Sequence, residues 1–265
     1  MASPRADLAL LTAAASEAGE IALSYFRAAP RVWEKVDDAG PVTEADLAVD
    51  AHLRTRLTAA RPAYGWLSEE SEDDARRLTA REVFVVDPID GTRAFVDGQA
   101  TWAISLAVVR DGAPVAAIVA LPARSRVFAA TLGGGATRDG VPLAASTRRR
   151  LDGANLLATR WSLGAKYWPG GVPDVVGHTR PSLAYRMALV GEGRFDGMVT
   201  FRDTWEWDIA AGSLIAAEAG ARVTDRRGAP LRFNSRHART AGVIAAPVGL
   251  HAALMARHVP RAGAS

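Results

Sequence analysis

Two carboxylates, Asp87 and Asp90, stand three residues apart at the end of an apolar run, in the stretch VVDPIDGT. Glu70 follows another short apolar run, and Asp208 precedes an alanine-rich helical pattern. Asp46 lies in the first turn of a predicted helix. Side chains at the ends of elements can converge in a cleft, so these acids are candidates for a single site.

Carboxylates that converge in this way need cations or protons between them. Two like charges about 4 Å apart repel by roughly 4 kcal/mol at an effective dielectric near 20. Several such pairs would exceed a typical protein stability of about 5–15 kcal/mol. Oxygen ligands without sulfur or imidazole suit Mg²⁺, Mn²⁺ or Ca²⁺ rather than Zn²⁺. The five histidines show no metal-site spacing, and the absence of cysteine excludes disulfides, thiolate sites and cysteine nucleophiles.

The residues after Asp90 suit a phosphate group. If a helix begins at Gly91 and Thr92, its first N–H groups are unpaired and can bind phosphate. Gly91 also lets the backbone approach a ligand closely, and the Ile89 carbonyl adds an oxygen ligand for a metal. Two metal ions about 4 Å apart with a phosphate between them are the arrangement of metal-assisted phosphoester hydrolysis.

Each of these features has a structural alternative when it is taken singly. DPIDG has the composition of a good turn. Glu70 and its acidic neighbours could form a solvated face, while Asp208 and Asp46 could each cap a helix. The functional interpretation gains weight because all of the features occur together in one chain.

Periodicity predicts the elements that position these residues. Apolar residues at helical spacing predict a helix over 5–27, and a pattern like a capping box begins a second helix near Thr43. A β-branched run predicts a buried strand over 83–87 that ends in a turn. Further strand-like runs over 102–143 predict a meander with a hairpin at Asp111–Gly112.

The change of texture near residues 146–150 predicts two halves, 1–150 and 151–265, the first carrying most of the acids. Strands and helices alternate in the second half, which predicts a partly parallel sheet with flanking helices. The fold class expected from these patterns is α/β, with α+β character in the first half.

Composition limits the classes of partner. Hydrophobic residues make up 49% of the chain and charged residues 23%, as in ordinary globular proteins. The net charge is only +3 and no basic stripe carries interleaved aromatics, so a nucleic acid polymer is not an expected partner. The sequence has no apolar run long enough for a bilayer and no signal-peptide pattern, so we expect a cytoplasmic protein without a membrane partner.

The motifs resemble those of the inositol monophosphatase superfamily of Mg²⁺-dependent, lithium-sensitive phosphatases. DPIDGTRAF at 87–95 is similar to the central motif of that family, and WDIAAG at 207–212 to its C-terminal motif. SEES at 68–71 and PVTEAD at 41–46 are similar to two further motifs. The order agrees across roughly residues 35–235. The resemblance implies a layered α/β/α/β/α sandwich, usually found in dimers.

The resemblance also implies a set of metal ligands. Glu70, Asp87 and the Ile89 carbonyl would hold the first Mg²⁺ ion. Asp87, Asp90 and Asp208 would hold the second, and Glu70 would help to hold a weaker third ion through water. Mn²⁺ is expected to substitute for Mg²⁺, whereas Ca²⁺ and Li⁺ are expected to inhibit.

The reaction implied by the resemblance is direct attack of a metal-activated water on the phosphorus, without a phospho-enzyme. Asp46 and Thr92 would orient and activate that water, with Glu70 assisting. Asp90 and the backbone N–H groups of Gly91 and Thr92 would bind the phosphate.

Departures from the family pattern bear on the substrate. Arg93 and Ala94 follow the central motif, and Phe201 stands where inositol phosphatases often place a glutamate that contacts the inositol ring. Arg186 and Arg202 are further candidates for contacts with the substrate, for example with a second phosphate or carboxylate. Surface salt bridging is the structural alternative for these arginines.

The sequence therefore predicts a Mg²⁺-dependent phosphomonoesterase that acts on a small phosphorylated metabolite. Residues 183–212 look like the bisphosphate nucleotidase branch, so adenosine 3′,5′-bisphosphate is the first substrate hypothesis. Residues 90–108 resemble the histidinol-phosphate phosphatase branch, and inositol 1-phosphate and histidinol phosphate remain alternatives. A non-catalytic phosphate-binding module would predict the loss of an acid, and a structural Ca²⁺ domain would predict ligands in one loop.

Overall fold

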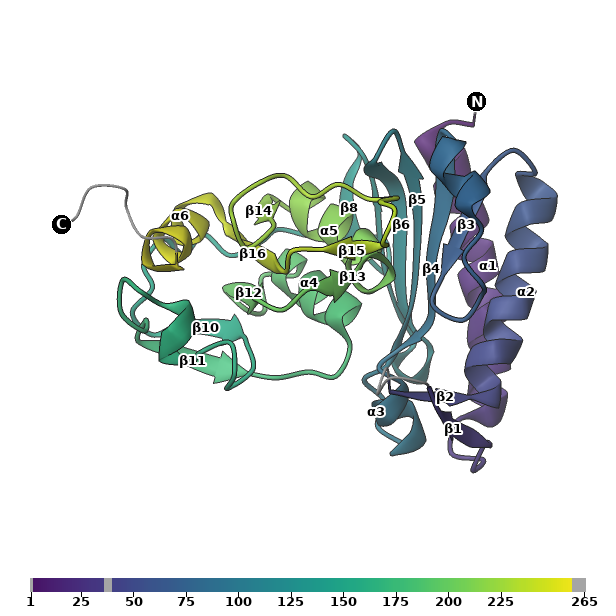
Figure 1. Ribbon diagram of the computed structural model, residues 1–265, viewed down its shortest axis with the longest axis horizontal. Helices are drawn as coiled ribbons and strands as arrows, with labels where there is room; N and C mark the ends of the chain where they lie inside the picture. Colours follow the sequence, from purple (N-terminus) through teal and green to yellow (C-terminus); the bar gives the residue numbers. More distant parts are fainter. Residues whose placement is uncertain (1, 36–39, 259–265) are drawn as a thin grey trace.

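The computed structural model describes residues 2–35 and 40–258 and forms five layers, in the order helix, sheet, helix, sheet, helix (Figure 1). This arrangement confirms the predicted α/β/α/β/α sandwich. The helices are α1 (Pro4–Tyr25), α2 (Glu44–Ala60), α3 (Thr92–Val96), α4 (Leu183–Gly191), α5 (Glu206–Glu218) and α6 (Val248–His258).

The larger sheet has seven strands, whose order in the sheet is their order in the chain. They are β3 (Gly65–Ser68), β4 (Glu82–Asp90), β5 (Ala103–Arg110), β6 (Ala113–Leu121), β7 (Arg126–Thr131), β8 (Gly135–Arg138) and β9 (Val141–Pro142). β3 and β4 are parallel, and every later pair is antiparallel, as the predicted meander requires. Asp111 and Gly112, with φ of 51° and 81°, form the tight hairpin between β5 and β6.

The smaller sheet is partly parallel, as the alternating second half predicted. Its strands are β10 (Ala154–Leu157), β11 (Val175–His178), β12 (Gly197–Thr200), β14 (Ala221–Thr224) and β16 (Val243–Pro247), in the order β11-β10-β12-β16-β14. β10 is parallel to β11 and β12, whereas β16 is antiparallel to its two neighbours. Two short antiparallel pairs complete the strands, namely β1 (Val32–Glu34) with β2 (Pro41–Thr43) and β13 (Thr204–Trp205) with β15 (Arg239–Thr240).

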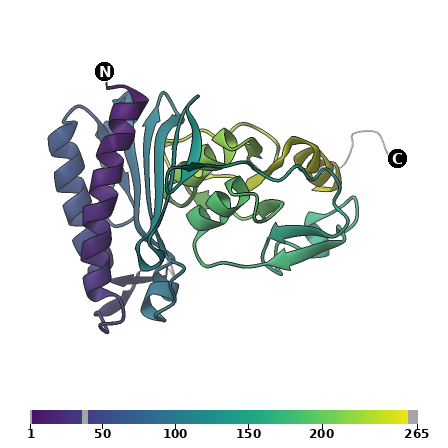
Figure 2. The ribbon, with the colours of Figure 1, turned by 180° about the vertical axis from the view of Figure 1, so that it is seen from behind.

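Apolar side chains fill the spaces between the layers. The paired helices α1 and α2 cover one face of the larger sheet (Figure 2), where Leu11 and Leu53 pack with Phe84 of β4. α4 and α5 lie between the two sheets, and α6 covers the outer face of the smaller sheet. α5 comes from the second half of the chain yet packs on strands of the first, so the division at residue 150 stays a prediction. Within the described ranges, no helix combines the length and apolarity needed to cross a membrane.

The strand that carries the central motif differs from the prediction. A strand ending at Asp87 and followed by a turn was expected, but β4 continues to Asp90. Its pairing with β5 shifts register between Asp87 and Asp90, which places Pro88 inside the irregularity. Proline has no N–H to donate to a neighbouring strand, so the ladder is interrupted without ending the strand. Both aspartates therefore lie on the strand itself rather than on a flexible turn.

Candidate active site

Three carboxylates from distant parts of the chain meet at one edge of the larger sheet. Glu69 follows β3, Asp87 lies in β4 and Asp208 lies in the first turn of α5, and one oxygen of each lies within 4.8 Å of the others. Because β3 and β4 are parallel, their carboxyl ends reach the same edge. Ser105 of β5 donates a hydrogen bond to the Trp207 carbonyl at 3.1 Å, which ties the start of α5 to that edge. We call Glu69, Asp87 and Asp208 the acid cluster.

The glutamate in this cluster is Glu69, whereas the sequence analysis had nominated Glu70. Both carboxylates accept hydrogen bonds of 2.6 Å from Nζ of Lys35, but only Glu69 joins Asp87 and Asp208. Burial and the neighbouring Glu69 charge raise the pKa of Glu70 to about 7. Burial acts to lower the pKa of Lys35, but the two glutamates outweigh it and raise that pKa above its ordinary value. No motif marks Lys35, so the sequence analysis missed it.

Asp87 lies at the centre of the cluster and is almost completely buried. Its Oδ1 atom has no hydrogen-bond partner among the described residues. Burial, followed by the charges of Glu69, Asp90 and Asp208, raises the pKa of Asp87 well above its usual range. An unpaired buried carboxylate oxygen is costly unless a cation binds it. With only carboxylates as donors, the cluster fits a hard divalent cation such as Mg²⁺.

Asp90 connects the acid cluster to α4. Its Oδ2 atom accepts hydrogen bonds from Ser182 Oγ and Ala184 N, both at 2.7 Å, and Oδ1 accepts one from Leu183 N at 3.2 Å. Burial raises the pKa of Asp90 to about 6 even though these hydrogen bonds lower it. The Asp90 charge also raises the pKa of Asp208, so the two carboxylates act on each other.

Asp46 and Thr92, the residues expected to act on water, lie side by side. Thr92 Oγ1 is 3.2 Å from Asp46 Oδ1 and 3.1 Å from the Ile89 carbonyl oxygen, and can donate to either. Oδ2 of Asp46 accepts the Thr43 N–H at 2.8 Å and the Thr43 hydroxyl at 2.5 Å, which completes the predicted capping box of α2. Burial raises the pKa of Asp46 to about 6.

The short helix α3 begins at Thr92, directly after the aspartates, with Gly91 as its N-cap. Gly91 has φ of +100°, a conformation that side chains strain to adopt. A Cβ at this position would meet Ser182 N at an ordinary van der Waals distance of 3.5 Å, so the backbone conformation, rather than a lack of space, favours glycine here.

The four nominated specificity residues lie in different environments. Arg93 is exposed on α3, and Ala94 is buried. Burial and the Asp90 charge raise the pKa of Asp208, and the Arg202 charge partly opposes this rise. The charges of Asp90 and Asp208 also act on Arg186, so both arginines lie within electrostatic reach of the acids. Arg186 is half-buried, whereas Arg202, like Arg93, is exposed.

Known proteins resemble this chain in sequence and in fold. The family model described as "Inositol monophosphatase family" matches residues 5–264. The chain is 36% identical over 195 residues to an inositol-1-monophosphatase of Rhizobium meliloti, covering 71% of this chain and 73% of that protein. It is 35% identical over 236 residues to a histidinol-phosphatase of Mycobacterium tuberculosis, covering 84% and 88%. A crystal structure of the extragenic suppressor protein suhB from Bartonella henselae has a TM-score of 0.83 at 27% identity, covering 97% of this chain and 99% of that chain.

Proposed function

The chain belongs to the inositol monophosphatase family, and from this premise we propose that it hydrolyses a small phosphate monoester with Mg²⁺ held at the acid cluster. Members of this family are phosphatases that act on phosphoric monoesters and generally depend on Mg²⁺. The observation that carries the proposal is the convergence of Glu69, Asp87 and Asp208 around a buried, unpaired Asp87 oxygen.

Each acid has a proposed role in holding the cofactor. Glu69, Asp87 and Asp208 would be the principal ligands, with Glu69 in the role first assigned to Glu70. Asp90 and the Ile89 carbonyl lie on the same strand and would complete the ligand set. Mg²⁺ bound there supplies Lewis-acid charge to the phosphoryl oxygens. Mn²⁺ as a substitute, a third ion near Glu70, and inhibition by Ca²⁺ or Li⁺ remain predictions.

The proposed base is the pair of Asp46 and Thr92. Asp46 is fixed by the two Thr43 donors, so its second oxygen is free to accept the Thr92 hydroxyl proton. Thr92 Oγ1 could then accept a proton from the attacking water. With a pKa near 6, Asp46 is mostly ionised at neutral pH and suits this role. The Gly91 and Thr92 N–H groups remain the proposed phosphate donors.

The names of the relatives make inositol 1-phosphate and histidinol phosphate the first substrates to test. Adenosine 3′,5′-bisphosphate belongs in the same panel because the sequence of residues 183–212 suggested it. A homodimer is part of the family resemblance and stays a prediction.

A phosphate-release assay tests the proposed function. Purified protein is incubated with the three substrates, in Mg²⁺ and in EDTA, and the released phosphate is measured. We expect release from at least one substrate in Mg²⁺ and none in EDTA. Equal release in EDTA would contradict the metal-dependent reaction, and no release from any substrate would contradict the proposed substrate class.

A further inference from the structure

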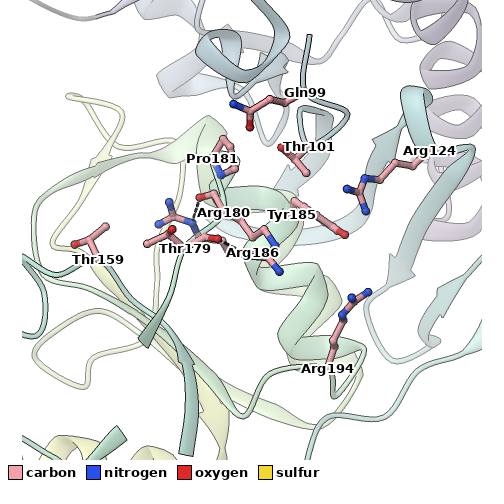
Figure 3. A pocket seen from close by; sticks show the side chains of 10 residues that line it. All are labelled: Gln99, Thr101, Arg124, Thr159, Thr179, Arg180, Pro181, Tyr185, Arg186 and Arg194. Atoms are coloured by element: carbon pink, nitrogen blue, oxygen red, sulfur yellow. Dashed lines mark hydrogen bonds between the residues drawn. The ribbon is translucent and has the colours of Figure 1, made fainter. Parts of the chain in front are cut away.

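A cavity of about 640 Å³ lies where the loop after α3 faces α4 and the segment before it. Figure 3 shows four arginines around it, Arg124 from the short turn after β6 and Arg180, Arg186 and Arg194 from the segment around α4. We call these four residues the arginine pocket. Its volume is in the range of about 300–1,000 Å³ that is usual for small-molecule sites.

The arginine pocket carries positive charge without a carboxylate in its lining. No aspartate or glutamate lines the cavity, and none of the four guanidinium groups forms an ion pair within the described ranges. Arg77, by contrast, pairs with Asp73, and Arg110 pairs with Glu82. Four guanidinium groups thus line this cavity without a carboxylate paired to any of them.

The hydrogen bonds that these arginines form leave several of their donors unused. Arg124 Nε donates to the Ala100 carbonyl at 2.8 Å, and Arg180 Nη1 donates to the Thr179 carbonyl at 2.6 Å. Arg186 Nε donates to the Arg180 carbonyl (Figure 3). A guanidinium has five N–H donors in a planar fork, which matches the oxygens of phosphate or carboxylate. Each arginine can therefore still bind an anion.

The pocket and the acid cluster share one segment of backbone. Pro181 lines the cavity, and the next residues, Ser182 to Ala184, donate their hydrogen bonds to Asp90. Arg186 lines the cavity and feels the charges of Asp90 and Asp208. The cavity and the acid cluster are therefore neighbouring regions, joined by this segment and by the charge of Arg186.

We propose that the arginine pocket binds a second anionic group, a phosphate or a carboxylate, on the same substrate whose phosphate ester is cleaved at the acid cluster. This inference rests on the proposed function and narrows its substrate class to phosphate monoesters with a second anion. The arginines would repel a cationic leaving group such as that of histidinol phosphate. They would add no binding energy for a neutral leaving group.

Binding of inorganic phosphate to the metal-free protein tests the pocket without any turnover. In EDTA the acid cluster repels phosphate, so saturable phosphate binding can be assigned to the arginine pocket. The ³¹P NMR line width measures this binding. We expect the double variant Arg124→Gln/Arg194→Gln to weaken this binding by about tenfold or more, because charge-assisted hydrogen bonds are lost. Both side chains are exposed, so the variant should fold, which circular dichroism checks. Arg5→Gln, an exposed arginine of α1, is the matched control and should bind as wild type does.

Absence of saturable binding, or binding that the double variant retains, would overturn the proposal. If a second copy of the chain covered the pocket with its own acids, no saturable phosphate binding would be seen. Light scattering on the same sample would identify that case.

Matched substrates test the pocket during turnover in Mg²⁺. Adenosine 3′,5′-bisphosphate is compared with adenosine 3′-monophosphate for a second phosphate, and 2-phosphoglycerate with glycerol 2-phosphate for a carboxylate. In at least one pair, we expect kcat/KM to favour the doubly anionic member by about tenfold or more. The preference, taken as the ratio of the two kcat/KM values within a pair, should disappear in the double variant and persist in Arg5→Gln.

The two possible failures are distinguishable. If the wild-type protein releases phosphate but shows no preference in either pair, or if the preference survives the double variant, the pocket does not select the substrate. If no compound is hydrolysed, the proposed function fails, and the phosphate titration still decides whether the arginines bind an anion.

Discussion

The acid cluster gathers negative charges, and the arginine pocket gathers positive charges. The two regions lie on the two sides of the segment before α4. The repulsion between carboxylates falls when they bind protons or cations. The raised pKa values of Asp87 and Asp208 show that protonation is favoured in the absence of a cation. Arginine does not lose its proton in proteins, so the repulsion among the four guanidinium groups can be reduced only by a bound anion. The two regions should therefore respond to different variables, the acids to Mg²⁺ and pH and the arginines to anions.

Removing one charge from the centre of the acid cluster should have the largest effect. Asp87→Asn keeps the shape of the side chain but loses the buried carboxylate oxygen that has no protein partner. We expect phosphate release to fall by about 10³-fold or more, since the loss of a metal ligand removes roughly 4 kcal/mol of transition-state stabilisation. The measurement is kcat in saturating Mg²⁺. Glu72→Gln, at an exposed acid close to Glu69 in sequence, is the control and should retain activity.

The two adjacent glutamates offer a sharper comparison within the acid region. Glu69→Gln removes a member of the acid cluster, whereas Glu70→Gln removes only a neighbour that shares Lys35. We expect a loss of about 10²-fold or more in kcat/KM for the first and about tenfold for the second. The reverse order would return the ligand role to Glu70.

The smallest of these effects is the change in the stability of the metal-free protein with pH. Glu70 has a pKa of about 7, and Asp46 and Asp90 have pKa values of about 6, all above those of the unfolded chain near 4. The folded state then binds more protons than the unfolded state between about pH 4 and 7, so these groups add stability as the pH falls through this window.

We expect urea unfolding in EDTA to show this gain, by at most about 3–4 kcal/mol for each carboxyl group, since one pKa unit corresponds to about 1.4 kcal/mol. Saturating Mg²⁺ should reduce the pH dependence, because the cation replaces the protons. The arginine variants should leave the pH dependence unchanged. A gain that persists unchanged in Mg²⁺ would mean that no cation binds close to these acids.

The acid region could be predicted from the sequence because local motifs carry it. DPIDGT and WDIAAG indicated Asp87, Asp90 and Asp208, and the capping pattern of Thr43 indicated the start of α2. The choice between Glu69 and Glu70 could not be made, because adjacent side chains at the end of a strand point in different directions. The continuation of β4 through Pro88 was also missed, since proline usually signals the end of a strand.

The arginine region was almost invisible in the sequence. Of its four residues only Arg186 was nominated, because Arg124 and Arg194 lie far apart in the chain and belong to no motif. The bonds from Ser182 to Asp90 span 92 positions, and nothing local in either segment predicts such a pairing. Contacts of this kind arise from the packing of α4 against the larger sheet and become visible only in the structure.

The central claim is that the acid cluster holds Mg²⁺, and a calorimetric titration of the phosphate-free protein with Mg²⁺ tests it most directly. The wild-type protein and Asp208→Asn are titrated side by side, with Glu72→Gln as the control. We predict saturable binding in the wild type and the control, and a loss of affinity of about tenfold or more in Asp208→Asn. Equal Mg²⁺ binding by all three proteins would contradict the claim.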